Sequence, residues 1–172
     1  MKHPRKVLWI ILSVIVIFFL FSIWYKLEYS MAVAESYQVN TPDFERKLLI
    51  ATQGSDFKDR VTQKIVNHYK SDSIFIEVVD ISLLDNVSPK EYSGIVILHT
   101  WENWKPPFVV RQFIERTTDQ HNKIVVLTTS GEGTYKIKEV DAITGESNTE
   151  KAQDFADQVI ERLQGISQLN SQ

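Results

Sequence analysis

The chain has 172 residues, with 19 lysine and arginine residues against 22 aspartate and glutamate residues and a formal net charge of −3 at pH 7. This acidic balance argues against nucleic acid as a partner. The sequence contains no cysteine, which excludes disulfides, thiol catalysis and sulfur-ligated metal centres. The four histidines lack the spacing of metal ligands, so we expect no metal site.

The first element is an apolar run at Val7–Tyr25, which only two serines interrupt. At 1.5 Å per residue a helix of this length covers roughly 28 Å, close to the hydrocarbon thickness of a bilayer. Three basic residues precede the run, namely Lys2, Arg5 and Lys6. Because basic residues gather on the cytoplasmic side of a span, we predict a cytoplasmic start at 1–6, a transmembrane helix at 7–25 and a periplasmic or extracellular remainder.

The alternative is a cleaved secretory signal, because Ala32-Val33-Ala34 resembles a small-residue cleavage site. The apolar run is longer than the core of about 7–15 residues that such signals carry. We therefore expect a retained anchor, although the sequence leaves cleavage near Ala34 open. Residues 26–46 show no sustained period and contain Asn40 and Pro42, so they are predicted to form a stalk or linker.

From Lys47 onward, apolar runs of strand length alternate with helical patterns. Four runs end in polar or glycine turns and are predicted strands: 48–52, 74–80, 95–100 and 124–129. Ser55 is a candidate N-cap for a helix after the first strand. A second helix should follow Pro107, with one apolar side made of Phe108, Val109, Gln112, Phe113 and Arg116. The clearest amphipathic pattern is the last, at Ala152, Phe155, Ala156, Val159, Ile160 and Leu163.

A fifth strand follows the fourth after only a few residues, whereas a parallel return normally needs a dozen or more. Either this strand is antiparallel, or the chain crosses back extended and only 140–143 pair in parallel. We favour the parallel arrangement because Val140–Gly145 leads directly into the last helix. The alternation predicts an open parallel α/β sheet covered on both faces, with its fourth helix missing or replaced by an extended crossover.

The segment 47–165 resembles the flavodoxin-like family. Ala51–Asp56 lies where that family places its phosphate-binding turn, Tyr92–Leu98 is similar to the approach to its third strand, and Lys123–Gly131 is similar to its fourth strand and turn. The resemblance implies the strand order 2-1-3-4-5, with a ligand crevice at the carboxyl ends of strands one, three and four. It also implies flavin mononucleotide (FMN) as a cofactor. Residues 166–172 are predicted to form a disordered tail.

The resemblance assigns the FMN phosphate to a turn at a helix start, where backbone N–H groups are free, and the flavin ring to nearby aromatic side chains. The candidate FMN-binding residues are Thr52, Gln53, Gly54, Ser55, Trp101, Trp104, Ser130, Gly131 and Tyr135. Asp56 departs from the family pattern, because a carboxylate beside a phosphate repels it by on the order of 1–4 kcal/mol. A side chain that fills the crevice would favour a degenerate site, and an open slot beside Gly54 would favour a flavin.

A separate stretch, Asp141–Ser147, resembles the motif by which some exported proteins accept a covalently attached flavin phosphate, with Ser147 as the acceptor. The alternative interpretation is a strand end and a turn in which Ser147 or Asn148 caps the last helix. No catalytic residue is assigned. Glu102 and Glu132 could form an acid–base pair at the mouth of the crevice, but carboxylates at loop tips are usually only solvated.

Two functions follow from this pattern. The first is a single-span membrane protein whose flavodoxin-like domain has a degenerate flavin site and serves as an accessory or interaction module of a membrane protein complex. Its partners would be the lipid bilayer and another membrane protein. The alternative is an FMN-binding, membrane-tethered oxidoreductase or electron carrier of the quinone reductase kind. The sequence does not decide whether the chain is an enzyme.

Overall fold

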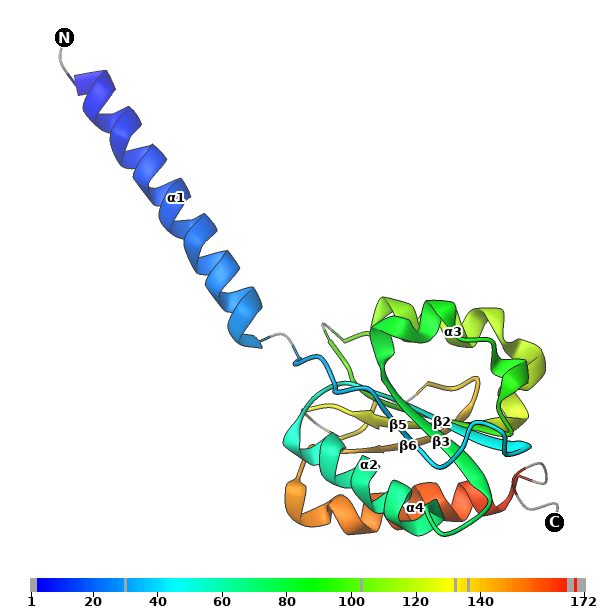
Figure 1. Ribbon diagram of the computed structural model, residues 1–172. Coiled ribbons are helices and arrows are strands. Elements are labelled where there is room, and N and C mark those ends of the chain that lie inside the picture. The colour runs from blue at the N-terminus through cyan, green and yellow to red at the C-terminus, as the bar shows by residue number, and fades with distance from the viewer. Residues whose placement is uncertain are drawn as a thin grey trace. The chain divides into compact units, whose positions relative to one another are not determined.

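The computed structural model describes residues 3–29, 31–102, 104–131, 133–135, 137–166 and 169. The chain separates into two units, Met1–Met31 and Ala32–Gln172. The first unit contains the helix α1 (His3–Tyr29) (Figure 1). Its segment Lys6–Trp24 is long and apolar enough to cross a membrane, as judged by length and composition.

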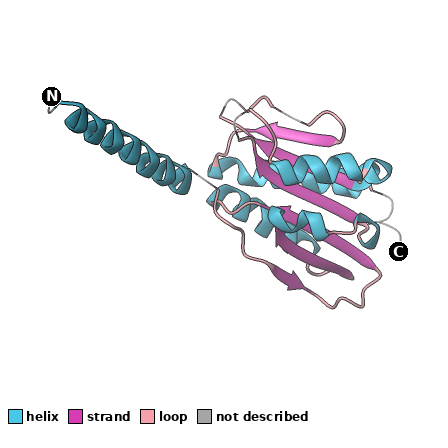
Figure 2. Cartoon of the chain, turned by 90° about the horizontal axis from the view of Figure 1, so that it is seen from above, coloured by secondary structure: helices cyan, strands magenta, loops and turns pink. Residues whose placement is uncertain are grey.

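The second unit is built on a six-stranded sheet with helices on both faces (Figure 2). The strands are β1 (Tyr37–Val39), β2 (Arg46–Thr52), β3 (Ile74–Asp80), β4 (Gly94–Thr100), β5 (Ile124–Thr129) and β6 (Asp141–Gly145). They lie in the order β1-β3-β2-β4-β5-β6. Strands β2 to β6 are parallel, and β1 pairs antiparallel with β3. Counted among themselves, the parallel strands follow the order 2-1-3-4-5 of flavodoxin-like sheets, which confirms the predicted fold class.

The last strand pairs in the favoured of the two predicted ways. β6 runs parallel to β5, with Val125 opposite Asp141 and Thr129 opposite Gly145. Among its described residues, the connection between β5 and β6 contains no helix. The Thr144 hydroxyl fastens this extended crossover to β6, because it donates to the carbonyl oxygens of Gly133 at 3.2 Å and Tyr135 at 2.6 Å.

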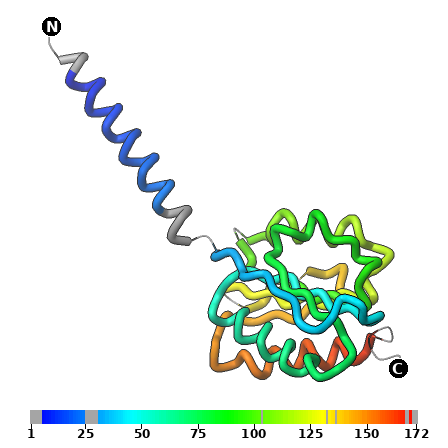
Figure 3. The backbone as a smooth tube through the Cα atoms, viewed as in Figure 1, coloured from blue at the N-terminus to red at the C-terminus, as the bar shows by residue number. Residues whose placement is uncertain are grey.

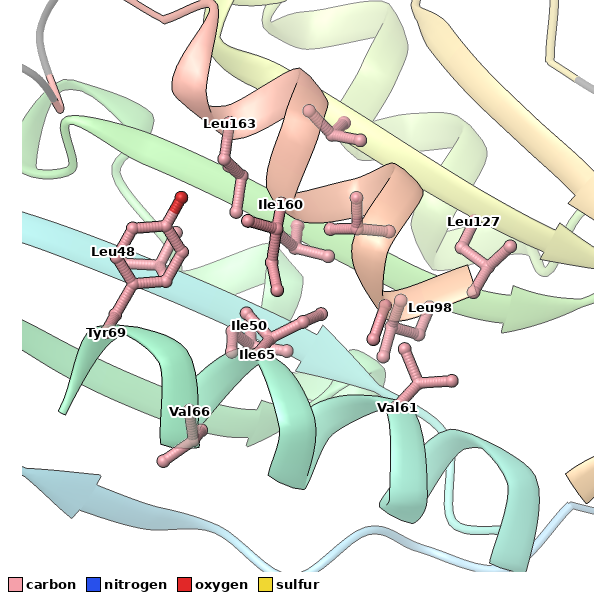
Figure 4. Close-up of a cluster of buried hydrophobic side chains, with 14 of the residues drawn as sticks. Leu48, Ile50, Val61, Ile65, Val66, Tyr69, Leu98, Leu127, Ile160 and Leu163 are labelled. Carbon is pink, nitrogen blue, oxygen red and sulfur yellow. The ribbon is translucent and has the colours of Figure 1, made fainter. Parts of the chain in front are cut away.

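The alternation of side chains along the strands divides the core between the two faces of the sheet. On one face, α2 (Asp56–Tyr69) and α4 (Ala152–Gln164) pack together over Leu48 and Ile50 (Figure 4). On the other, α3 (Phe108–Arg116) packs over Leu49 and Ala51. Short 3-10 helices complete the second unit: η1 (Ile81–Asn86), η2 (Pro89–Glu91), η3 (Thr118–Lys123) and η4 (Thr149–Lys151). Ser55 caps α2 as predicted, since its Oγ accepts from the Lys58 N–H.

The buried side of α3 agrees with the predicted one only in part. Val110, Phe113 and Ile114 face the core, whereas Phe108 is 63% exposed. Phe108 is the first residue of the helix, and the three-and-four spacing that reaches the sheet begins two residues later. The sequence pattern was therefore right for Phe113 and wrong for Phe108.

The folded unit begins at Ala32 and not at Lys47, so much of the predicted linker 26–46 belongs to it (Figure 3). β1 lies inside that segment, and Asn40 follows it in the left-handed region with a φ of 71°. The Asn40 side chain donates to the carbonyl oxygen of Ile74 at 2.8 Å and so closes the connection back to β3. In the predicted tail, Ile166 and Leu169 are buried in the core, and residues 167, 168 and 170–172 lie outside the described residues.

Candidate functional site

The predicted phosphate-binding turn follows β2, and the chain's own backbone binds its Gly54 N–H, while a cavity of about 530 Å³ lies beside the turn, with Gly54, Ser55 and residues 32–35 among its walls. Residues Ala32–Ala34, which we call the strap, lie across the turn. The Gly54 N–H donates to the carbonyl oxygen of Ala32 at 2.8 Å, and the Ala34 N–H donates to Asp80 Oδ2 at 2.8 Å. Ala32 and Gly54 form an antiparallel bridge. The N–H that a phosphate would need at Gly54 is therefore already bound.

A lysine side chain fills the neighbouring space at the carboxyl ends of β2 and β4. Lys58 is 1% exposed, and its Nζ donates to Thr100 Oγ1 at 2.8 Å and to Ser55 Oγ at 3.3 Å. Burial lowers the pKa of this ammonium to about 8, although Asp59 and Glu102 favour the charged form. The position that resembles the family's crevice thus holds an internal cation.

Gln53 and Thr52 also form hydrogen bonds within the protein at the ends of these strands. The Gln53 side chain accepts from the Thr100 N–H at 2.7 Å and donates to Glu102 Oε1 at 2.9 Å. Thr52 is buried, and its hydroxyl donates to the Gln53 carbonyl oxygen at 3.1 Å. These bonds order the turn without any ligand, so pre-organisation of the turn is not by itself a sign of phosphate binding.

The aromatic residues proposed to enclose a flavin ring contact each other instead. Trp101 and Tyr135 stack with their ring centroids 4.8 Å apart and their planes within 14°. A flavin between two rings needs about 7 Å, because each ring-to-ring contact occupies about 3.5 Å. Trp104 does not join them, since it is 77% exposed. The Trp101 and Tyr135 rings therefore leave no room for a flavin ring between them.

The other predicted residues are divided between buried and exposed positions. Ser130 is buried, its N–H donates to the Gly145 carbonyl oxygen at 3.2 Å, and its Oγ has no hydrogen-bond partner among the described residues. Gly131 is exposed, with open space around it. Ser147 is exposed in the turn after β6, and Asn148 caps the short helix η4, and not α4, by accepting from the Glu150 N–H at 2.9 Å. Glu132 lies outside the described residues.

One cavity of about 500 Å³ lies on the α3 face beside Trp101. Its walls include the apolar side chains of Pro106, Ile114 and Ile137 and polar groups of both signs, such as Arg111 and Glu115. Among the residues that the structure describes, no group of three or more histidine, aspartate or glutamate side chains is arranged to hold a metal ion.

Among the comparisons with known proteins, the one with solved structures gives matches. No protein-family model matches the sequence, and a search of the curated proteins gives no match. Among solved structures, the chain is similar to a flavodoxin from the domain Archaea, with 12% identity, 70% of this chain and 99% of that chain covered, and a TM-score of 0.48. It is also similar to oxidised Flavodoxin 2 from Bacillus cereus, with 16% identity, 67% and 99% covered, and a TM-score of 0.40. These likenesses carry no argument about function, and the flavodoxin-like architecture of this chain rests on its strand order.

The position of the strap leads to a test at Gly54. A Cβ at this residue would lie 2.9 Å from the Ala32 carbonyl oxygen and 3.0 Å from that of Val33, both of which are backbone atoms. Because no rotamer change relieves such a contact, Gly54→Ala should displace the strap and lose a hydrogen bond worth about 1 kcal/mol, together with the close packing. We expect elastase, which cuts after small residues, to cleave at 32–34 roughly tenfold faster, since about 1.4 kcal/mol corresponds to a factor of ten.

Gly131→Ala is the matched control, because a Cβ there meets no atom within 4 Å. Cleavage of this variant should proceed at the wild-type rate. Equal cleavage of wild type and Gly54→Ala would contradict the role assigned to the strap.

Proposed function

We propose that the chain is a single-span membrane protein that carries a flavodoxin-like domain with a degenerate flavin site outside the cytoplasm, where it acts as an accessory module of a membrane protein complex. The apolar helix α1 is the proposed anchor. Lys2, Arg5 and Lys6 precede its apolar segment, so the start of the chain is placed in the cytoplasm.

The observation that carries this proposal is the hydrogen bond from the Gly54 N–H to Ala32. Flavin phosphates depend on free N–H groups at such a turn, and here the strap takes one of them. The buried ammonium of Lys58 and the contact between Trp101 and Tyr135 support the same conclusion. A flavodoxin-like domain that cannot hold its flavin retains its surface for binding other proteins.

The test is a titration of the full-length protein, purified in detergent, with FMN. We expect no stoichiometric complex: the visible spectrum of FMN should stay that of the free flavin, and gel filtration should separate flavin from protein. Stoichiometric FMN that stays with the chain through gel filtration would overturn the degenerate site. A flavodoxin loaded under the same conditions serves as the positive control.

A membrane-tethered FMN oxidoreductase is the second candidate. The buried Ser130 Oγ and Trp101 Nε1 favour it, because neither has a hydrogen-bond partner among the described residues, whereas buried polar atoms normally have one. Trp101 also lines the cavity on the α3 face described above. The same FMN titration separates the two functions. In the second case FMN would bind, and Ser130→Ala would weaken that binding.

A further inference from the structure

We propose that the loop Trp104–Phe108 is a second membrane contact, which docks the folded unit on a zwitterionic lipid surface. The inference rests on the proposed anchoring of α1. In the described part of the folded unit, large apolar side chains are exposed at Val33, Leu83, Trp104 and Phe108. The two aromatic residues of this set lie four positions apart, Trp104 in the turn after β4 and Phe108 at the first residue of α3, with 77% and 63% of their surface exposed.

Trp104 stands at a backbone position that disfavours its side chain. Glu102 and Lys105 exchange two backbone hydrogen bonds of 2.9 and 3.0 Å, which makes a tight hairpin turn. Trp104 lies between them with a φ of 58°. Left-handed positions in such turns favour glycine, and a bulky residue there costs about 1–2 kcal/mol. Since the ring gains no burial in return, the stability of the fold does not explain a tryptophan at this site.

The chemistry around the two rings is that of a membrane interface. Tryptophan prefers the boundary between headgroups and hydrocarbon, and basic side chains beside it can extend toward headgroups. Lys105 is exposed next to Trp104, and the guanidinium of Arg111 lies 5.5 Å from the centre of the Phe108 ring. Aromatic rings flanked by cations are typical of segments that lie in the interface.

The chain enters the folded unit at the same edge of the sheet as this loop. Ala32 bridges Gly54, which comes just after the carboxyl end of β2. Trp104 follows the carboxyl end of β4, and β2 and β4 are parallel neighbours. α1 ends at Tyr29, so at most about 10 Å of chain separates its end from Ala32. If α1 lies in a bilayer, this short connection acts as a tether. It raises the effective concentration of lipid at this edge of the sheet.

Acidic groups near this edge decide the kind of lipid. Glu35 and Asp56 are exposed beside the strap, and Glu102 is exposed beside the loop. These carboxylates would repel anionic headgroups, which offsets the attraction of Lys105 and Arg111. Docking should therefore depend on the rings and occur on phosphatidylcholine.

The test uses the full chain in phosphatidylcholine vesicles that contain brominated acyl chains, which quench tryptophan fluorescence. Trp9→Phe and Trp24→Phe remove the tryptophans of α1, so that Trp101 and Trp104 report. We expect strong quenching in this background and loss of most of it on Trp104→Phe. A reporter moved to the opposite edge, Trp104→Phe with Asn122→Trp, should not be quenched, since residue 122 precedes the amino end of β5.

Flotation of the vesicles at alkaline pH separates the failure of this inference from that of the proposed function. If the chain does not float with the lipid, α1 is not an anchor and both proposals fail. If the chain floats and Trp104 is not quenched, the anchor stands, the lipid contact is overturned and the exposed rings are left for a protein partner. Quenching that reaches the Asn122→Trp reporter equally would also overturn the assigned orientation.

Discussion

Replacing Phe113 by alanine should lower the free energy of unfolding of the folded unit by about 3–5 kcal/mol, the range for removing a buried phenylalanine ring. Phe113 is 0% exposed and lies in the core between α3 and the sheet. The ring also lies 4.8 Å from the guanidinium of Arg116, an attraction that the substitution removes. The expected loss is a large part of the stability of a domain of this size.

Phe108→Ala is the matched control on the same helix. Phe108 is largely exposed, so the same truncation should change the free energy of unfolding by less than about 0.5 kcal/mol. Urea unfolding in detergent, followed by far-ultraviolet circular dichroism, measures both variants. Equal losses would show that Phe108 is packed as deeply as Phe113, as the sequence pattern suggested, and would contradict the exposed position described above.

The second large effect is a loss of stability in mild acid caused by His99. This side chain is 0% exposed, its Nε2 lies 3.1 Å from Thr128 Oγ1, and burial, with a smaller contribution from Lys58, lowers its pKa to about 4. In the unfolded chain the pKa of histidine is about 6.5. Between these values the unfolded state binds the proton and the folded state does not, so stability falls as the pH falls from about 6.5 toward 4.

The loss attributable to His99 over that range should approach about 3 kcal/mol, because each pKa unit is worth about 1.4 kcal/mol. His99→Gln keeps a group that can bond to Thr128 and removes the titration. Aspartates and glutamates titrate in both proteins, so the difference between the two curves of unfolding free energy against pH isolates the histidine. Parallel curves for wild type and His99→Gln would contradict a neutral, buried His99.

The central parallel strands, β2 to β5, were predictable because each is a short apolar run buried on both faces. Ile95–Leu98 is an example, and every residue of it is buried. The absence of a helix from the described residues between β5 and β6 was also predicted, because only Ser130–Thr134 separate the fourth apolar run from the strand-like stretch that begins at Tyr135. β1 was not, because Tyr37–Val39 is a strand only by pairing with the edge of β3. Nothing in those residues alone distinguishes them from a linker.

The interior of the candidate site was less accessible to sequence reasoning, for two different reasons. Lys58 left a signal: it stands three and seven residues before Val61 and Ile65, which places it on the buried side of α2. A long stem can be buried there while the ammonium reaches the strand ends. The strap has no such signal in the sequence. Its hydrogen bond to Gly54 joins backbone atoms of residues 22 positions apart, and no pattern of side chains predicts it.

The short strand β1 has a consequence for how copies of the protein behave when they are crowded together. Without it, β3 would end the sheet with seven residues, Ile74–Asp80, whose free N–H and C=O groups could pair with another chain. β1 covers part of that edge and leaves only three residues as the new border. The opposite border, β6, is also short, with five residues. Both ends of the sheet are therefore poor templates for strand addition, which protects the domain against edge-to-edge aggregation.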